Sequence, residues 1–156
     1  MNGQYQRQQH GRNQNRQGNK NSGHGGDDSL PTFQSKWITE GADDKMIEFV
    51  EKLGKKLKEH GISASQLRNI YGEIMRIKLK GFEELKTDFK LLKPKVAYNG
   101  AKLSKDSQKK FFKTAFIEEA FVPAYNKVED EKTFENFQKF FEAILAYHKY
   151  FENVKN

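Results

Sequence analysis

Residues 130–151, DEKTFENFQKFFEAILAYHKYF, contain the pattern that decides the fold class. Aromatic and apolar side chains recur here three or four positions apart, which places them on one face of an α-helix. The members of this face are Phe134, Phe137, Phe141, Ile144, His148 and Phe151. Phe140, Leu145 and Tyr147 widen it beyond the apolar face of an ordinary surface helix. We therefore predict a helix that is either central in the core or shared with a neighbouring subunit.

The same spacing predicts four more helices earlier in the chain, at about residues 43–60, 63–80, 83–98 and 104–121. The first has an expected core stripe of Ile47, Val50, Leu53 and Leu57. The second has a stripe of Leu67, Ile70, Tyr71, Ile74 and Ile77. Neither an alternating strand pattern nor a hairpin dipeptide occurs between apolar runs. The sequence thus predicts an all-α fold, a single bundle of about five helices behind a disordered N-terminal tail.

Local signals mark several helix ends. Ser63 and Gln66 have the S-x-x-Q spacing of a capping box, so a helix is expected to begin at Ser63. Proline removes a backbone donor and disfavours helical geometry in the preceding residue. We therefore expect the helix of residues 83–98 to kink or restart at Pro94. By the same reasoning, Pro123 should end or bend the helix that begins near Ser104.

Two regions differ in composition. Residues 1–29 are rich in Gln, Asn, Gly and Arg, with almost no aliphatic side chains, so this segment is expected to be a disordered tail. Its arginines could contact RNA, but a solubilising extension is the preferred interpretation. Residues 30–156 form the predicted helical domain. Trp37, the only tryptophan, is expected to pack against the bundle rather than stack on a base.

The composition also limits the location and the chemistry of the 156-residue chain. It contains no cysteine, which excludes a disulfide framework, a thiolate zinc site and a cysteine nucleophile. No apolar run approaches the roughly 20 residues needed to cross a bilayer. The first residues lack the apolar core of a secretory signal. We therefore expect a cytoplasmic protein without a membrane partner.

Positive charge is concentrated in one part of the sequence. The formal net charge is +7, but residues 66–113 alone contain thirteen lysines and arginines against five carboxylates. Three of these lysines, Lys105, Lys109 and Lys113, recur four positions apart on one side of the expected fourth helix. A localised basic block indicates a polyanionic partner or an acidic protein, although it can also be a solvated surface.

The usual signatures of catalysis are missing. Neither a phosphate-binding G-x-x-x-x-G-K-[ST] loop nor a strand-linked G-x-G-x-x-G motif occurs. His60 is expected at a helix C-terminus, where a cation is favourable, and His148 lies on a core stripe as a structural histidine. Adjacent pairs such as Glu118-Glu119 diverge by about 100° around a helix and do not converge on one substrate. We expect no enzyme activity, no cofactor and no metal site.

Three segments point to a known family. They are SQLRNIY at residues 65–71, LLKPKVAY at residues 91–98 and FFEAILAYHK at residues 140–149, in that order. In this order and spacing, the chain resembles the small subunit of type III-A CRISPR effector complexes, the Csm small-subunit family. The resemblance covers about residues 36–151 and does not include the tail.

The resemblance implies an all-helical, non-catalytic subunit that takes part in antiviral defence. Its copies would stack beside the backbone subunits and the large polymerase-like subunit, and together they would hold guide RNA and target RNA. In such a complex, base pairing between guide RNA and target RNA recognises the sequence. The protein is therefore expected to contact the RNA backbone and to recognise the shape of the RNA. The RNA-binding residues expected from the basic block and the matching motifs are Arg68, Asn69, Arg76, Lys93, Lys95, Tyr98 and Lys102. Lys102 stands where the family pattern has an arginine. A lysine keeps the positive charge but cannot form the two parallel hydrogen bonds that a guanidinium makes with a phosphate.

One alternative remains open at this point. The chain can be a helical scaffold whose basic surface meets an acidic protein and whose wide C-terminal helix meets a neighbouring subunit, without direct RNA contact.

Overall fold

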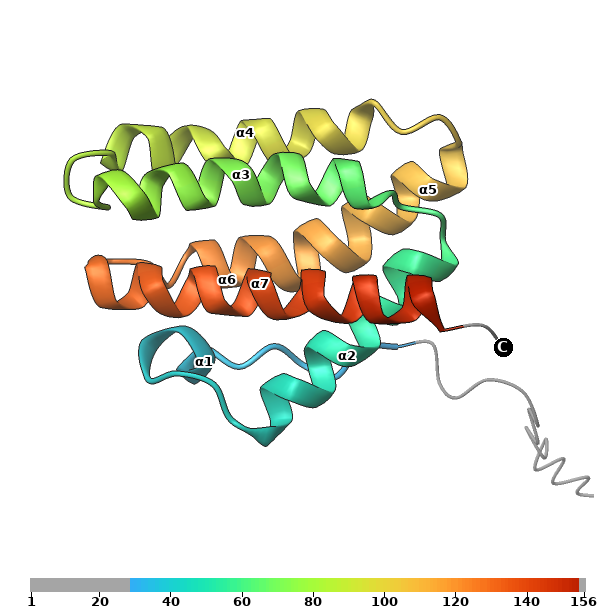
Figure 1. The fold of residues 1–156 in the computed structure, drawn as a ribbon, viewed down its shortest axis with the longest axis horizontal. Helices are drawn as coiled ribbons and strands as arrows, with labels where there is room; N and C mark the ends of the chain where they lie inside the picture. The colour runs from blue at the N-terminus through green and yellow to red at the C-terminus, as the bar shows by residue number, and fades with distance from the viewer. Residues whose placement is uncertain (1–28, 155–156) are drawn as a thin grey trace, which may run out of the picture.

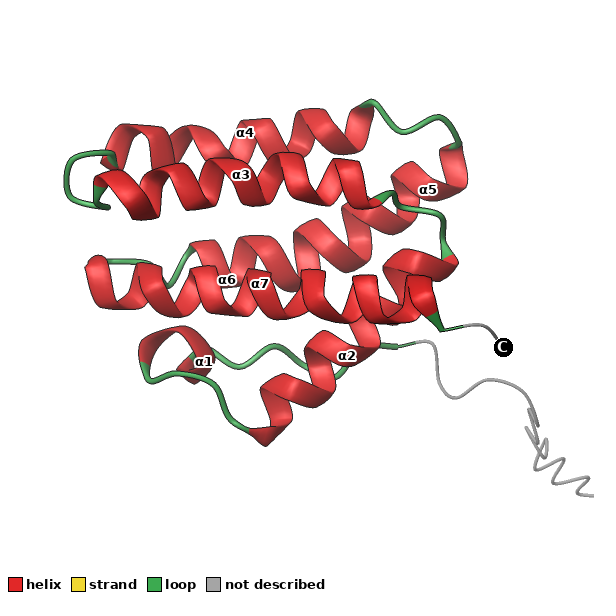
Figure 2. Ribbon diagram, in the orientation of Figure 1, coloured by secondary structure: helices red, strands yellow, loops and turns green. Residues whose placement is uncertain are grey.

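The computed structural model describes residues 29–154, and every regular element in that range is a helix (Figures 1 and 2). In chain order these elements are α1 (Lys36–Thr39), α2 (Asp44–Glu59), α3 (Ala64–Lys80), α4 (Lys86–Ala101), α5 (Asp106–Phe111), the π-helix η1 (Phe112–Phe121), α6 (Val122–Tyr125) and α7 (Glu131–Asn153). The predicted all-α class is confirmed. Residues 1–28, which make up nearly all of the predicted tail, lie outside the described residues.

The long helix α7 lies at the centre of the bundle. It runs between the α3–α4 hairpin and the α1–α2 segment, and α5, η1 and α6 pack on a further side (Figure 1). Its side chains Phe134, Phe137, Phe140, Phe141 and Ile144 are all at most 2% exposed. Most of the apolar face predicted from the sequence therefore lies in the core, whereas Leu145, Tyr147 and Phe151 are only partly buried. Trp37 is 1% exposed, so its predicted packing against the bundle is confirmed.

Three helices begin at side-chain caps. The Asp43 carboxylate accepts a hydrogen bond from the Met46 amide at 2.8 Å, and Asp130 accepts one from the Thr133 amide at 2.8 Å. These backbone donors lower the pKa of both aspartates because they stabilise the charged form. The predicted capping box at Ser63 is confirmed, with both reciprocal hydrogen bonds to Gln66 present.

The first predicted core stripe was wrong at one position. Ile47 is 41% exposed, whereas its neighbours Met46 and Phe49 are at most 2% exposed. A helical period fits a stripe that includes Ile47 as well as one that includes Met46 and Phe49. The position of α7 decides which of these two stripes is buried. Val50, Leu53 and Leu57 are fully buried as expected. In α3, Leu67, Ile70, Ile74 and Ile77 are buried, and Tyr71 is partly buried.

Of the two alternatives predicted at Pro94, a kink or a restart, the restart was wrong, because α4 runs without interruption from Lys86 to Ala101. Pro94 has no amide hydrogen to donate to the carbonyl of Lys90, four residues earlier. That carbonyl accepts a hydrogen bond from the Tyr125 hydroxyl at 3.3 Å instead. Tyr125 thus supplies a hydrogen bond to the carbonyl that Pro94 leaves without its helical donor.

The predicted helix of residues 104–121 is divided into α5, η1 and α6. Within η1 each turn is wider than an α-helical turn, a geometry that sequence periodicity does not reveal. Pro123 does not end this helical segment, which continues to Tyr125. Pro123 occupies an initial position of α6, directly after the wider turns of η1. Across the described range, none of the helices has both the length and the apolar character required to span a bilayer.

Candidate nucleic-acid interface

Helices α3 and α4 form an antiparallel hairpin that an ion-pair network bridges on its surface. The Arg76 guanidinium donates to Asp88 at 2.5 Å and to Glu73 at 3.1 Å. The Lys95 ammonium donates to the same Glu73 carboxylate at 3.0 Å. The hydrogen bond from Lys95, followed by that from Arg76, lowers the pKa of Glu73. The hydrogen bond with Asp88 is the main cause of the raised pKa of Arg76.

This network changes the interpretation of two predicted RNA-binding residues. Arg76 and Lys95 remain partly exposed, with 42% and 48% of their side chains accessible. However, each cation faces a carboxylate, so the pair adds little net positive charge to this part of the surface. Their evident role is to join α3 to α4 across 12 and 22 residues of sequence.

Three other predicted residues lie on the same face of the hairpin. Asn69 is one helical turn before Glu73, and Tyr98 is one turn after Lys95. The Tyr98 ring is 63% exposed, and the Lys102 ammonium lies 4.7 Å from its centroid. Within residues 29–154, Lys102 forms no ion pair, so its charge is available to a phosphate. An exposed aromatic ring beside a cation can stack on a base or contact a backbone.

The remaining two predicted residues are on other sides of the hairpin. Arg68 lines a groove between α3 and α7, together with Tyr71, Leu145 and Lys149, and its Nε donates to the Ala64 carbonyl at 3.4 Å. Lys93 lies on the side of α4 that faces α6, with its ammonium 5.9 Å from the centre of the Tyr125 ring. The structure therefore does not gather all seven predicted residues on one surface.

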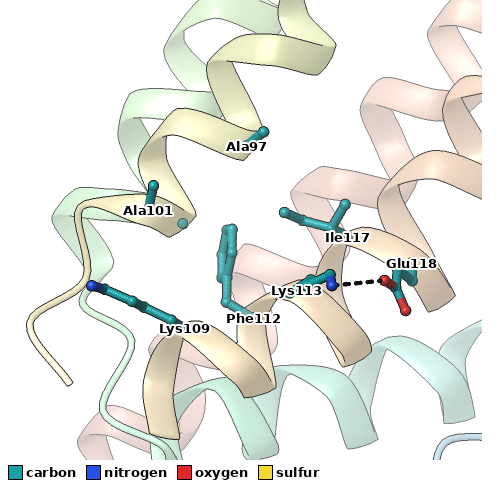
Figure 3. A pocket seen from close by; sticks show the side chains of 8 residues that line it. Ala97, Ala101, Lys109, Phe112, Lys113, Ile117 and Glu118 are labelled. Carbon is teal, nitrogen blue, oxygen red and sulfur yellow. Dashed lines mark ion pairs between the residues drawn. The ribbon is translucent and has the colours of Figure 1, made fainter. Parts of the chain in front are cut away.

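Two lysines outside the predicted set extend the basic surface around α4. Lys109 and Lys113 line a pocket with Ala97 and Ala101, next to the turn of helix that contains Lys102 (Figure 3). Their spacing of four residues on the expected fourth helix was the signal in the sequence. They were not assigned to the site because the approach of α4 to η1 is a tertiary contact.

His148 has two polar partners in the core. Its Nε2 is 2.8 Å from the Ile62 carbonyl oxygen, and its Nδ1 is 2.9 Å from the Glu152 carboxylate. The prediction of a structural core histidine is confirmed. His60 follows α2 and stacks on the Phe111 ring at 3.7 Å between centroids. In the part of the chain that the structure describes, no three His, Asp or Glu side chains are grouped so that they could hold a metal ion.

Comparison with known proteins supplies the family. The model of the family described as Csm2 Type III-A matches residues 41–154. The chain belongs to the Csm2 type III-A family. It is therefore a small subunit of the type III-A CRISPR effector complex, a structural component that assembles with the other Csm subunits. No curated protein and no solved structure matches the chain.

The Csm2 match agrees with the resemblance in the sequence and covers all of α2 to α7. The three motif segments lie within it, on α3, α4 and α7. The Csm2 chain thus places the motif residues on the hairpin and on the central helix, with Tyr98 and Lys102 exposed and His148 buried.

Proposed function

We propose that this Csm2 chain is a non-catalytic RNA-binding subunit that holds guide RNA and target RNA through backbone contacts in antiviral defence. The supporting observation is the distribution of charge around α4. Lys93 and Lys95 project from this helix, Lys102 directly follows it, and Lys109 and Lys113 project from the helical segment packed beside it. Cations in such an arrangement neutralise phosphates and release counterions without reading bases.

The ion pairs rank the contributions of these residues. Arg76 pairs with Glu73 and Asp88, and Lys95 pairs with Glu73. A phosphate would have to compete with these carboxylates for the two cations. Lys93 and Lys102 instead lie over tyrosine rings, and a cation over a ring can still reach a phosphate. We therefore expect Lys93 and Lys102 to contribute more to RNA affinity than Arg76 and Lys95.

The test is the salt dependence of RNA binding. The variant Lys93→Ala/Lys102→Ala should bind RNA more weakly than the wild type, and the slope of log affinity against log salt should fall by about 0.7–0.9 per lost contact. The matched control is Lys127→Ala/Lys132→Ala, which removes two exposed lysines near the start of α7. The control should behave as the wild type. Equal affinity and equal slope in both variants would contradict the proposal.

A scaffold without RNA contact is the second candidate, and two observations favour it. The Arg76 and Lys95 charges are largely satisfied within the chain. In addition, Leu79 and Leu91 are 82% and 51% exposed on the hairpin, where another protein can contact them. Photocrosslinking of assembled complexes separates the two proposals. RNA adducts within residues 66–113 support RNA binding, and their absence supports the scaffold.

We also propose that copies of the chain stack on one another beside the backbone and polymerase-like subunits. The exposed apolar side chains of the hairpin are available for such contacts. Mass measurement of the intact complex, with wild type and with Leu79→Glu/Leu91→Glu, tests this proposal. We expect fewer copies per complex in the variant.

A further inference from the structure

An apolar pocket lies where the C-terminal half of α4 meets α5 and η1, and we call it the α4–η1 pocket. It has a volume of about 400 Å³ and is open to solvent. Figure 3 shows the Phe112 ring between the alanines of α4 on one side and Ile117 on the other. The full set of lining residues is Ala97, Gly100, Ala101, Lys109, Phe112, Lys113, Ile117 and Glu118.

The pocket exists because α4 presents only small residues there. Ala97, Gly100 and Ala101 contribute no large side chain to the pocket wall, while the Phe112 ring packs directly against Gly100 and is covered by it. A Cβ atom at Gly100 would lie 2.7 Å from that ring, so glycine permits the close approach of the two helices. Phe112 is 2% exposed and stacks on Phe116 at 4.6 Å between centroids, which holds its ring in place. The apolar wall is thus preformed.

The mouth of the pocket is positively charged. Lys109 and Lys113 are exposed at its edge, and Lys102 directly follows Ala101. Lys113 is 75% exposed, and its closest carboxylate partner, Glu118, is 4.0 Å away, at the limit of an ion pair. An apolar slot beside cations fits a nucleotide, which combines a flat apolar base with an anionic phosphate. The cations at the mouth favour an occupant that is anionic as well as apolar.

We propose that the α4–η1 pocket takes one unstacked nucleobase of single-stranded RNA, with the flanking phosphates on Lys109 and Lys113. This inference rests on the proposed RNA-binding function and adds a base subsite to a surface that otherwise contacts only backbone. The walls are apolar and every base has a π-face, so the subsite accepts different bases. It therefore adds affinity without making the subunit select its guide.

Pocket-filling variants test this proposal. Ala97→Phe and Ala101→Phe replace exposed residues of α4 with side chains that occupy the slot, and Ala42→Phe introduces the same change at an exposed position before α2. The purified chain is titrated by fluorescence anisotropy with a labelled oligouridine and with an abasic oligomer of equal length. Circular dichroism confirms that each variant keeps its helical content.

The wild type and Ala42→Phe should bind oligouridine about 5- to 100-fold more tightly than the abasic oligomer. Both pocket variants should lose most of this preference while keeping wild-type affinity for the abasic oligomer. Pocket variants that retain the preference overturn the base subsite. Variants that lose affinity equally for both probes also overturn it, because the pocket then acts only through the backbone.

The outcome for the wild type separates this inference from the proposed function. Wild-type binding to neither probe contradicts the RNA-binding function itself, whereas equal binding to both probes contradicts the base subsite alone. If the pocket variants do not fold, photocrosslinking of the wild type to 4-thiouridine-containing RNA still tests whether a base occupies the α4–η1 pocket. Adducts on the residues that line the pocket support the subsite, and adducts confined to residues outside it overturn it.

Discussion

Gly54 lies where α2 crosses α7, and replacing it with alanine should destabilise the protein. A Cβ atom at this position would be 2.7 Å from the Tyr147 Cβ and 2.9 Å from the His148 amide nitrogen. Ordinary contacts between carbon atoms are about 3.5–4.0 Å, so the two helices would have to move apart by roughly 1 Å. Neither contacting atom can be relieved by a side-chain rotation, because one is backbone and the other is a Cβ.

The expected magnitude follows from two opposing effects. Inserting a methyl group into a closely packed contact costs about 1–3 kcal/mol. Replacing a helical glycine with alanine contributes about 0.5–1 kcal/mol of stability. The Gly54 contact is tight and immovable, so we expect Gly54→Ala to lower the free energy of unfolding by about 1–2 kcal/mol. That corresponds to a fall in Tm of about 3–8 °C for a chain of this size.

Gly72 supplies the matched control, because it is also inside a helix but has nothing within 4 Å of an added Cβ. Gly72→Ala should raise the free energy of unfolding by about 0.5–1 kcal/mol through helix propensity alone. Urea denaturation followed by circular dichroism measures both variants. A Gly54→Ala protein as stable as the wild type would refute the close crossing of α2 and α7, and a destabilised Gly72→Ala protein would refute the exposure of α3 there.

Three further outcomes can be checked by the same denaturation assay. Asp130→Ala removes the cap of α7 and should lower the urea midpoint; an unchanged midpoint would count against the cap. Glu73→Gln should cost less than about 1 kcal/mol at neutral pH, because its pairs are exposed. Since the partner Lys95 holds the pKa of Glu73 below its usual 4.5, this contribution is complete above that pH and disappears as the pH falls further, where wild type and variant should converge. His148→Ala leaves the buried Ile62 carbonyl without its partner and opens a cavity, so a loss of about 2–4 kcal/mol is expected, and a loss below 1 kcal/mol would contradict the buried contact.

The basic residues illustrate how far sequence reasoning reaches for the candidate interface. The concentration of lysines and arginines in residues 66–113 was visible directly, as was the repetition of Lys109 and Lys113 four residues apart. Their assignment to surfaces was not. Arg76 meets Asp88 across 12 residues, and Arg68 faces α7 rather than α4. A count of charges cannot distinguish a cation that has a partner from one that is available.

The sequence by itself determined the helical class, most helix ends and the family. Caps such as Ser63 with Gln66, and core stripes such as the one in residues 130–151, depend on side chains within about four positions of one another, so they are encoded locally. Family motifs are likewise continuous segments. Local encoding explains why the helices expected at residues 43–60, 63–80 and 130–151 agree with α2, α3 and α7 to within two residues, whereas the one expected at 104–121 is divided into α5, η1 and α6.

Only the tertiary structure decided which side of each helix is buried and which charges remain available. Phe49 rather than Ile47 faces the core because of where α7 passes, and α4 continues through Pro94, where the Tyr125 hydroxyl reaches the Lys90 carbonyl. The hydrogen bond between Tyr125 and Lys90 joins residues that are 35 positions apart. The burial of Phe49 depends on the position of a neighbouring helix. Such contacts follow from the packing of whole helices, which is a property of the folded chain and not of any short segment.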